Sequence, residues 1–252
     1  MSVRSETELI QEIERLRASL TAREHEAAVK ERQLQRYAAD LRETFKQERT
    51  RAQELQRSYT ATVSALSNAV EARDAYTGRH AERVSAYGME LARAVGLPLE
   101  DIPRLQFGFL LHDIGKVAVP DAILYKPEAL SDEERALMEQ HPLIGAEIVG
   151  RVEFLSGAVD IVRSHHEWWD GTGYPDGLAG EAIPLAARVF AVADVLDALT
   201  TTRPYRPASS FAVARGMITA ASGTQFDPRV IEAFNSIEDR VFEQTAAQIG
   251  AG

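Results

Sequence analysis

The first seventy residues alternate apolar and charged positions with the period of a helix. Residues 5–70 contain neither proline nor glycine, and apolar or near-apolar positions recur at steps of three, four or their sums. This seam consists of Leu9, Ile13, Leu16, Leu20, Ala27, Leu34, Tyr37, Leu41, Phe45, Ala52, Leu55, Tyr59 and Leu66. Steps of three and four are the heptad spacing of coiled coils. We therefore expect one long helix over this range.

The seam is imperfect but too long for a helix that stands alone. Charged residues interrupt it at Arg23, Lys30 and Glu48, and the four-plus-four step at residues 37–45 is typical of a stutter. A single helix cannot bury its own stripe, so either it folds back on its own domain or it pairs with a second copy. We predict that residues 1–68 form a parallel coiled coil that makes a homodimer and could pass on a signal from a partner protein.

From residue 69 onward the pattern is that of a compact helical domain. Gly78 is the first glycine of the chain, and Ser131 with Glu134 forms a capping-box signature. Helices are predicted over 75–95, 99–111, 131–141, 142–152, 154–166, 185–201, 208–221 and 228–247. Residues 170–184 form a Gly/Pro-rich loop, and a loop of that length is more often functional than idle. Since we find no convincing set of alternating strands, the predicted fold is all-α, with residues 69–252 as its second domain.

Composition excludes several classes of protein. The chain has 252 residues, of which 45% are hydrophobic, and it has no cysteine, which rules out thiolate metal sites and disulfides. It contains no run of 18 apolar residues, and its first residues are polar. We therefore expect no membrane insertion and a cytoplasmic location.

The net charge of −10 is unevenly distributed. Residues 1–70 carry 12 Lys or Arg against 11 Asp or Glu, and the remaining residues carry 16 against 27. So acidic a domain argues against binding DNA or RNA, which requires a basic surface. A phosphate ligand would have to be held by a few placed cations or by metal ions.

Histidines gather in the second domain. Five of the six lie between residues 80 and 166, and the sixth, His25, lies in the predicted coiled coil. Asp113 follows a histidine directly, and Asp194 lies in an otherwise apolar helix, where an unpaired carboxylate would be costly. Each histidine alone is more typical of a structural residue, but together they could hold two metal ions that share a carboxylate. A set of imidazole and carboxylate groups without sulfur suits iron or manganese, with zinc possible.

Two motifs connect these residues to a known family. Residues 112–116 read His-Asp-Ile-Gly-Lys, and residues 165–175 read His-His-Glu-Trp-Trp-Asp-Gly-Thr-Gly-Tyr-Pro. Over about residues 70–235 the chain resembles the HD-GYP subfamily of the HD superfamily of metal-dependent phosphohydrolases. The resemblance implies an HD-type helical bundle and hydrolysis of cyclic di-GMP to linear pGpG, with GMP left open as a further product, by a hydroxide that bridges the metal ions.

The resemblance also implies roles for individual residues. Asp113 would bridge the metal ions, Lys116 and Tyr174 would position phosphate, and so would two cations of the segment Arg203-Pro204-Tyr205-Arg206. The two cations of this segment are Arg203 and Arg206. The catalytic residues would be Asp113 and Lys116. The implied metal ligands are His80, His112, Asp113, His141, His165, His166 and Asp194. Some family members have a glutamate four residues before the first histidine and hold three metals; this chain has Tyr76 there, so we expect two, iron or manganese.

The chemistry is reasonable on physical grounds, and two alternatives stay open. Two metal ions about 3.5–4 Å apart can lower the pKa of a water between them and neutralise phosphoryl charge. An HD-type hydrolase of another cyclic dinucleotide or nucleotide would carry similar residues. A catalytically silent sensor or interaction module would normally have lost a ligand, whereas all seven positions are filled here.

Overall fold

The computed structural model describes residues 6–73, 79–98, 102–202 and 207–250. Within these ranges the regular elements are all helices, and the only β-type pairing is one isolated bridge between Ser222 and Phe226. This confirms the predicted all-α fold. Its contacts divide the chain into two compact units, Met1–Ser58 and Tyr59–Gly252. The domain boundary predicted at residue 68 lies ten residues beyond this division and stays a prediction.

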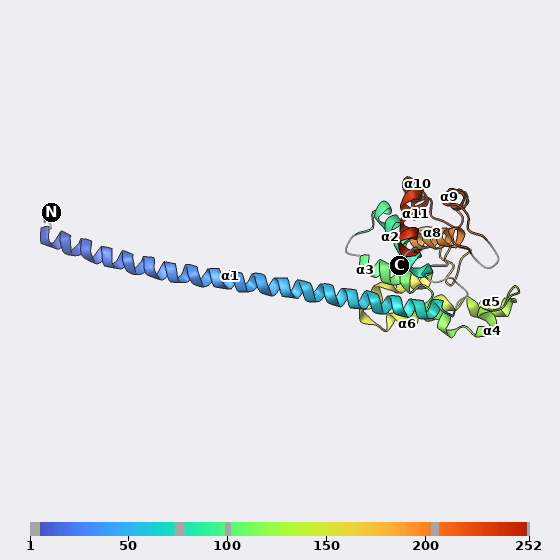
Figure 1. Cartoon of the computed structure of the whole chain (residues 1–252), viewed down its shortest axis with the longest axis horizontal. Helices are drawn as coiled ribbons and strands as arrows, with labels where there is room; N and C mark the ends of the chain where they lie inside the picture. The colour runs from blue at the N-terminus through green and yellow to red at the C-terminus, as the bar shows by residue number, and fades with distance from the viewer. Residues whose placement is uncertain (1–5, 74–78, 99–101, 203–206, 251–252) are drawn as a thin grey trace. The chain divides into compact units, whose positions relative to one another are not determined.

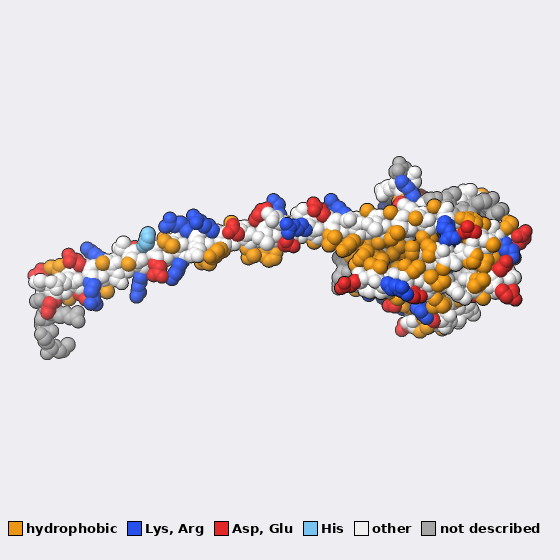
Figure 2. All heavy atoms as spheres, turned by 90° about the horizontal axis from the view of Figure 1, so that it is seen from below, with side chains coloured by type: hydrophobic (Ala, Val, Ile, Leu, Met, Phe, Trp, Pro, Cys, Tyr) orange, Lys and Arg blue, Asp and Glu red, His pale blue; other side chains and the backbone are white. Residues whose placement is uncertain are grey.

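Helix α1 (Glu6–Glu71) is one unbroken helix, as the seam predicts (Figure 1). Its surface carries ion pairs between residues that lie one helical turn apart, such as Lys30 Nζ and Glu26 Oε1 at 2.6 Å. Charged groups lie along the helix with apolar side chains between them (Figure 2). Seam residues within the first unit are solvent-exposed in the single chain, for example Leu34 at 66% and Phe45 at 67%.

The second unit is a bundle of short helices. After the end of α1 come α2 (His80–Val95), α3 (Ile102–Leu110), η2 (Ile114–Ala118), α4 (Asp121–Leu124), α5 (Asp132–Met138), α6 (His141–Gly150), η3 (Glu153–Ala158), α7 (Val159–Ser164), η4 (Gly180–Ala182), α8 (Leu185–Thr200), α9 (Phe211–Ala220), α10 (Pro228–Ser236) and α11 (Asp239–Gly250). Helix α2 packs on α3, α8, α10 and α11, while α6 packs on η2, η3 and α7. None of the helices in the described ranges is long and apolar enough to cross a membrane.

Two apolar cores hold this unit together. The larger joins α2, α8, α9, α10 and α11 around side chains such as Tyr87, Phe190 and Phe234. The smaller joins α3, η3 and α7 to the end of α1, where Val63 is buried and the ring of Tyr59 stacks on Phe154 with centroids 4.2 Å apart. The last turns of α1 are therefore part of the folded unit.

Helix boundaries were predicted well where caps are local and poorly where tertiary contacts set them. Ser131 Oγ accepts from Glu134 N at 3.3 Å, and Glu134 Oε2 accepts from Ser131 N at 2.8 Å, so the capping box is confirmed. The single helices predicted over 154–166 and 228–247 were wrong. The first begins as the 3-10 helix η3, and the second is interrupted between α10 and α11.

The interruption at residues 237–238 comes from Arg215 of α9. Its guanidinium donates to Phe234 O at 2.7 Å and to Ile237 O at 2.8 Å, and its Nε donates to Asp239 Oδ1 at 2.7 Å. These bonds satisfy the last carbonyls of α10 and hold the first residue of α11, so two helices replace the continuous one.

Candidate metal centre

Six of the seven ligand candidates come together because they lie at or near the end of a helix. His80 begins α2, His141 begins α6, and His165 follows the last residue of α7. His112 and Asp113 occupy the short connection between α3 and η2. Side chains at helix ends can converge on one point from separate elements. Only Asp194 projects from within a helix, α8.

All seven predicted ligand candidates fall into two groups. Asp113, His141, His165 and His166 form the first, and His80, His112 and Asp194 form the second; in each, one ligand atom per residue lies within 4.8 Å of all the others. Sequence reasoning therefore identified the residues that the fold assembles.

Asp113 touches both groups. Its Oδ1 lies 3.2 Å from His141 Nε2, in the first group, and its Oδ2 lies 3.1 Å from His112 Nε2, in the second. Oδ2 also lies 2.8 Å from Lys116 Nζ. Burial by itself would raise the pKa of Asp113, but the neighbouring His112 and Lys116 keep it well below its usual range, so the carboxylate is charged. A charged carboxylate between two ligand groups can bridge two cations.

Backbone carbonyls fix which nitrogen of three imidazoles faces the centre. Nδ1 of His112 lies 2.9 Å from Phe109 O, that of His141 lies 2.8 Å from Met138 O, and that of His165 lies 2.8 Å from Val162 O. Because a carbonyl oxygen can only accept, each Nδ1 carries the proton. In the neutral ring Nε2 then has a free lone pair directed at the centre, as a metal ligand requires.

The geometry fits a bound cation. Nε2 of His141 lies 3.2 Å from Nε2 of His165, and with the proton on Nδ1 the neutral form of either ring has no proton at Nε2 to share. Among the described residues, the buried Asp113 Oδ1 has no hydrogen-bond partner of acceptable geometry. Two facing lone pairs and an unsatisfied carboxylate oxygen would repel each other in isolation, whereas a divalent ion would satisfy all three.

Protonation in the first group favours metal binding. Burial lowers the pKa of His166 to about 3, and burial together with the neighbouring histidines lowers that of His165 well below its usual value. Both imidazoles are therefore neutral near pH 7.

The apolar ring of Phe190 lies against the centre. Its centroid is 4.6 Å from that of the His112 ring and 5.6 Å from that of the His165 ring.

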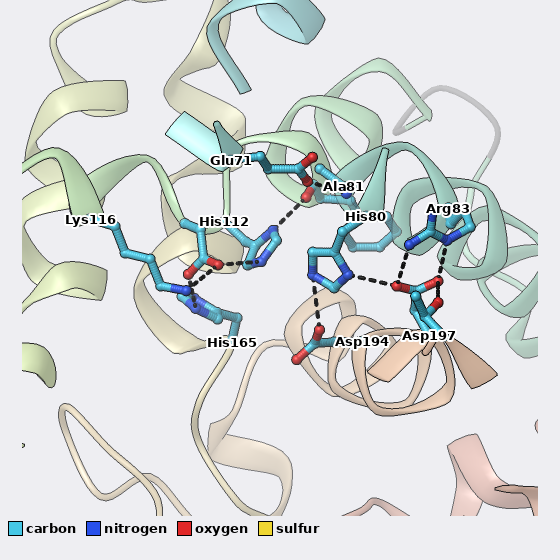
Figure 3. A network of polar contacts seen from close by, with 12 residues as sticks. Glu71, His80, Ala81, Arg83, His112, Lys116, His165, Asp194 and Asp197 are labelled. Atoms are coloured by element: carbon cyan, nitrogen blue, oxygen red, sulfur yellow. Dashed lines mark hydrogen bonds and ion pairs between the residues drawn. The ribbon is translucent and has the colours of Figure 1, made fainter. Parts of the chain in front are cut away.

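The second group is held by a carboxylate behind it. His80 lies between two aspartates of α8, with Nδ1 2.7 Å from Asp197 Oδ2 and Nε2 3.3 Å from Asp194 Oδ1 (Figure 3). Burial lowers the pKa of His80, but its hydrogen bonds with Asp194 and Asp197 outweigh burial and raise the pKa to about 10. Asp197 in turn forms a two-point ion pair with Arg83. Arg83 Nε lies 2.6 Å from Asp197 Oδ1, and Arg83 Nη2 lies 3.1 Å from Asp197 Oδ2. Asp197 on Nδ1 orients the ring of His80, and a metal ion bound at Nε2 would displace the proton there.

The loop after His166 folds back over the first group. Tyr174 N donates to His166 O at 3.2 Å, and its ring stacks on that of His166 with centroids 4.7 Å apart. Glu167 is buried, and its two carboxylate oxygens accept from Asp176 N at 2.7 Å and Leu178 N at 3.0 Å. The buried glutamate thus anchors the loop that presents Tyr174.

Two glycines allow close backbone approach at the centre. A Cβ on Gly115 would clash with the backbone carbonyl of His141, and one on Gly173 would clash with the backbone of Trp168 and His166. Glycine is therefore required in both motifs for packing: Gly115 lets η2 approach the start of α6, and Gly173 lets its loop fold back on the backbone of His166 and Trp168.

Some expectations could not be located, and some residues were missed. Arg203, Arg206 and Tyr76 lie outside the described residues. The sequence did not reveal that Glu167 holds the loop or that Arg83 grips Asp197. A signal for the latter existed, since Arg83 lies one turn after His80 on the same helix.

Comparisons with known proteins agree with this geometry. The family model described as HD domain matches residues 64–230. A protein named cyclic di-GMP phosphodiesterase response regulator RpfG, from Xanthomonas campestris pv. campestris, is 40% identical over 219 residues, covering 85% of this chain and 55% of that protein. The 3'3'-cGAMP-specific phosphodiesterase 2 of Vibrio cholerae is also 40% identical, over 195 residues that cover 77% of this chain and 35% of that protein. The chain thus spans about half, or less, of the length of these relatives.

Solved structures share the fold. The protein Bd1817 of Bdellovibrio bacteriovorus, described as a HDG"Y"P protein, matches with a TM-score of 0.50 at 26% identity over 62% of this chain and 50% of that one. The cyclic GMP-AMP specific phosphodiesterase V-cGAP3 of V. cholerae matches with a TM-score of 0.54 at 23% identity over 75% of this chain and 48% of that one, which supports the fold alone. With its His-Asp pair between two ligand groups and its Gly-Tyr-Pro loop folded over them, the chain belongs to the HD domain family, in its HD-GYP branch.

Proposed function

We propose that this chain is a metal-dependent phosphodiesterase that hydrolyses cyclic di-GMP to linear pGpG, with GMP left open as a further product. The observation that carries the proposal is the position of Asp113 between two groups of ligand atoms. Relatives at about 40% identity are named for this activity. His80, His112 and Asp194 would hold one divalent ion, His141, His165 and His166 another, and Asp113 both. Bound ions would supply an activated water and neutralise phosphoryl charge.

The protein's own groups would orient the phosphodiester. Lys116 Nζ lies 2.8 Å from Asp113 Oδ2, so its positive charge is adjacent to the bridging position. Burial, with Asp113 and Glu139 nearby, raises the pKa of Tyr174, so its hydroxyl stays protonated and can donate to a phosphoryl oxygen. These two donors would select the phosphate orientation in an otherwise acidic domain. Roles for Arg203 and Arg206 in the same task stay predictions.

The donor set also limits the metal. Imidazole and carboxylate groups without sulfur suit iron or manganese, and two ligand groups suit two ions.

The cytoplasmic location expected for this protein from its sequence stays a prediction.

Assembly is part of the proposal. The exposed apolar seam of α1 supports a parallel coiled-coil homodimer, because a helix with such a seam buries it by pairing. Residues 1–68 would then connect two catalytic domains and could receive input from a partner protein.

A second substrate is supported by one specific observation. A relative named as specific for 3'3'-cGAMP is as similar to this chain, at 40% identity, as one named for cyclic di-GMP. The substrate of this chain is therefore a cyclic dinucleotide whose bases must be determined by assay.

The test is hydrolysis by protein purified without air or chelators and supplied with Fe²⁺ or Mn²⁺. We expect cleavage of cyclic di-GMP, with 3'3'-cGAMP measured in parallel. His112→Ala should lose activity, while His25→Ala, a histidine on the exposed part of α1, should retain it. No hydrolysis of either dinucleotide by metal-loaded protein would contradict the proposal, and preference for 3'3'-cGAMP would change its substrate.

A further inference from the structure

The end of α1 and Arg73, two residues beyond it, make three contacts that the proposed function does not use. The side chains involved are those of Ser67, Glu71 and Arg73. Each makes a hydrogen bond to the backbone of a different segment of the second unit, Tyr59–Gly252, which we call the HD unit. Ser67 and Glu71 are buried, at 5% and 9% exposure. Each bonded segment carries a residue assigned above to the metal centre or to phosphate.

Glu71 supplies a cap that α2 lacks. The residue before this helix, Arg79, has a left-handed φ of 73° and no side-chain capping bond. Glu71 Oε1 instead accepts from Ala81 N at 2.5 Å, across ten residues of sequence (Figure 3). A carboxylate is favourable at a helix N-terminus, where the first amides have no partner within the helix. Ala81 follows His80 directly, so this bond fixes the turn from which His80 reaches the centre.

Ser67 and Arg73 bond the other two segments. Ser67 Oγ donates to Leu110 O at 2.7 Å, at the end of α3 and two residues before His112. The guanidinium of Arg73 donates to Val117 O at 3.0 Å and Val119 O at 3.2 Å, and it also reaches Lys116 O at 3.3 Å. These carbonyls lie in η2, which carries Lys116, or directly after it.

Glu71 also borders the centre itself. A small cavity with room for about one water molecule is lined by Ser67, Glu71, His112 and Asp113 among others. Glu71 Oε2 is buried and has no hydrogen-bond partner among the described residues. The end of α1 therefore lies directly behind the ligand residues.

From these contacts we propose that Ser67, Glu71 and Arg73 are positioning residues, through which the end of α1 sets the places of His80, His112 and Lys116. All three act on backbone groups at helix ends, where an unmade hydrogen bond leaves a polar group unsatisfied and the segment free to shift. Displacement of α1 would move all three segments together. The proposal rests on the proposed function only for its catalytic readout, because metal binding can be measured without substrate.

The test is titration of the metal-free full-length protein with Mn²⁺ by calorimetry. Glu71→Ala should weaken Mn²⁺ binding by about 10- to 100-fold, the usual effect of removing a group that supports a metal ligand. Glu71→Gln keeps an oxygen that can accept from Ala81 N and should recover most of the affinity. Val230→Ala removes buried volume from α10, far along the chain from these contacts, and serves as the control for lost stability. It should lower the melting temperature without weakening Mn²⁺ binding.

Three results would overturn the proposal: wild-type affinity in Glu71→Ala, a Glu71→Gln variant as weak as Glu71→Ala, or equal weakening in Val230→Ala. Arg73→Ala adds a catalytic readout, since displacement of Lys116 should raise KM more than it lowers Mn²⁺ affinity.

A second measurement covers failure of the proposed function. If the wild-type protein binds no Mn²⁺, that function fails, and amide hydrogen exchange in the first turn of α2 then tests the positioning contact. Exchange there should be faster in Glu71→Ala than in Val230→Ala, and equal rates would contradict the contact.

Discussion

The exposed part of α1 and the HD unit use the same kinds of residue in opposite ways. Along residues 6–58 the apolar side chains lie in solvent, and charged residues pair with neighbours one turn away on the same helix. In the HD unit, two apolar cores are buried, and charged residues near the centre pair across long sequence separations, as Arg83 does with Asp197. In the proposed account the first region pairs with a second copy, and the second holds charge at one point. The two properties should therefore be separable by mutation.

The largest expected effect is loss of chemistry without loss of association. Asp113→Ala removes the carboxylate that touches both ligand groups. Because removing a mere supporting group already costs about 10- to 100-fold, hydrolysis should fall by more than about 100-fold. Activity assays measure this, with His25→Ala as the matched control. Light scattering should give the same mass for both variants, and a dissociated Asp113→Ala would show that the two regions are coupled.

Loss of association without loss of chemistry is expected from Leu41→Asp, which places a charge in the exposed seam of α1. A charge buried between paired helices is strongly unfavourable, so the dimer should dissociate. Thr50→Asp, off the seam, is the control and should leave the mass unchanged. The measurement is sedimentation velocity. A wild-type protein that is already monomeric would refute the coiled-coil dimer.

Alanine substitutions at two glycines of the HD unit should change the free energy of unfolding in opposite directions. Gly115→Ala would push a Cβ into the carbonyl of His141 and should lower the free energy of unfolding by about 1–3 kcal/mol. Gly216, exposed within α9, has open space around it, so Gly216→Ala should raise that free energy by up to about 1 kcal/mol. Urea unfolding measures both. Equal effects would mean that the contact between η2 and α6 is not tight.

The smallest effect is expected at the loop. Tyr174→Phe removes one donor to phosphate but keeps the ring that stacks on His166. Loss of one hydrogen bond should raise KM by up to about tenfold. Steady-state kinetics on the metal-loaded enzyme measure this, and metal content should not change. A lower metal content would assign Tyr174 to the centre itself.

How much the sequence could predict follows the range of the forces involved. The long helix predicted from the seam and the cap at Ser131 rest on local patterns, and both the helix and the cap were confirmed. The seven ligand candidates came from the gathering of histidines and from the resemblance to the HD-GYP family; the fold brings them into two close groups, and their role as ligands stays a prediction. The break at residues 237–238 was not, because it depends on Arg215 reaching from another helix. The contacts of Glu71 and Glu167 were missed for the same reason, since both bind backbone amides that no local pattern reveals.

The central claim is that Asp113 joins two metal-binding groups, and the number of ions bound per chain tests it most directly. Calorimetric titration of metal-free wild-type protein with Mn²⁺, checked by elemental analysis, should give two ions per chain. The same titration of Asp113→Ala should give fewer than two, while His25→Ala should still give two. Two ions bound by Asp113→Ala with wild-type affinity, or fewer than two bound by the wild-type protein, would contradict the account.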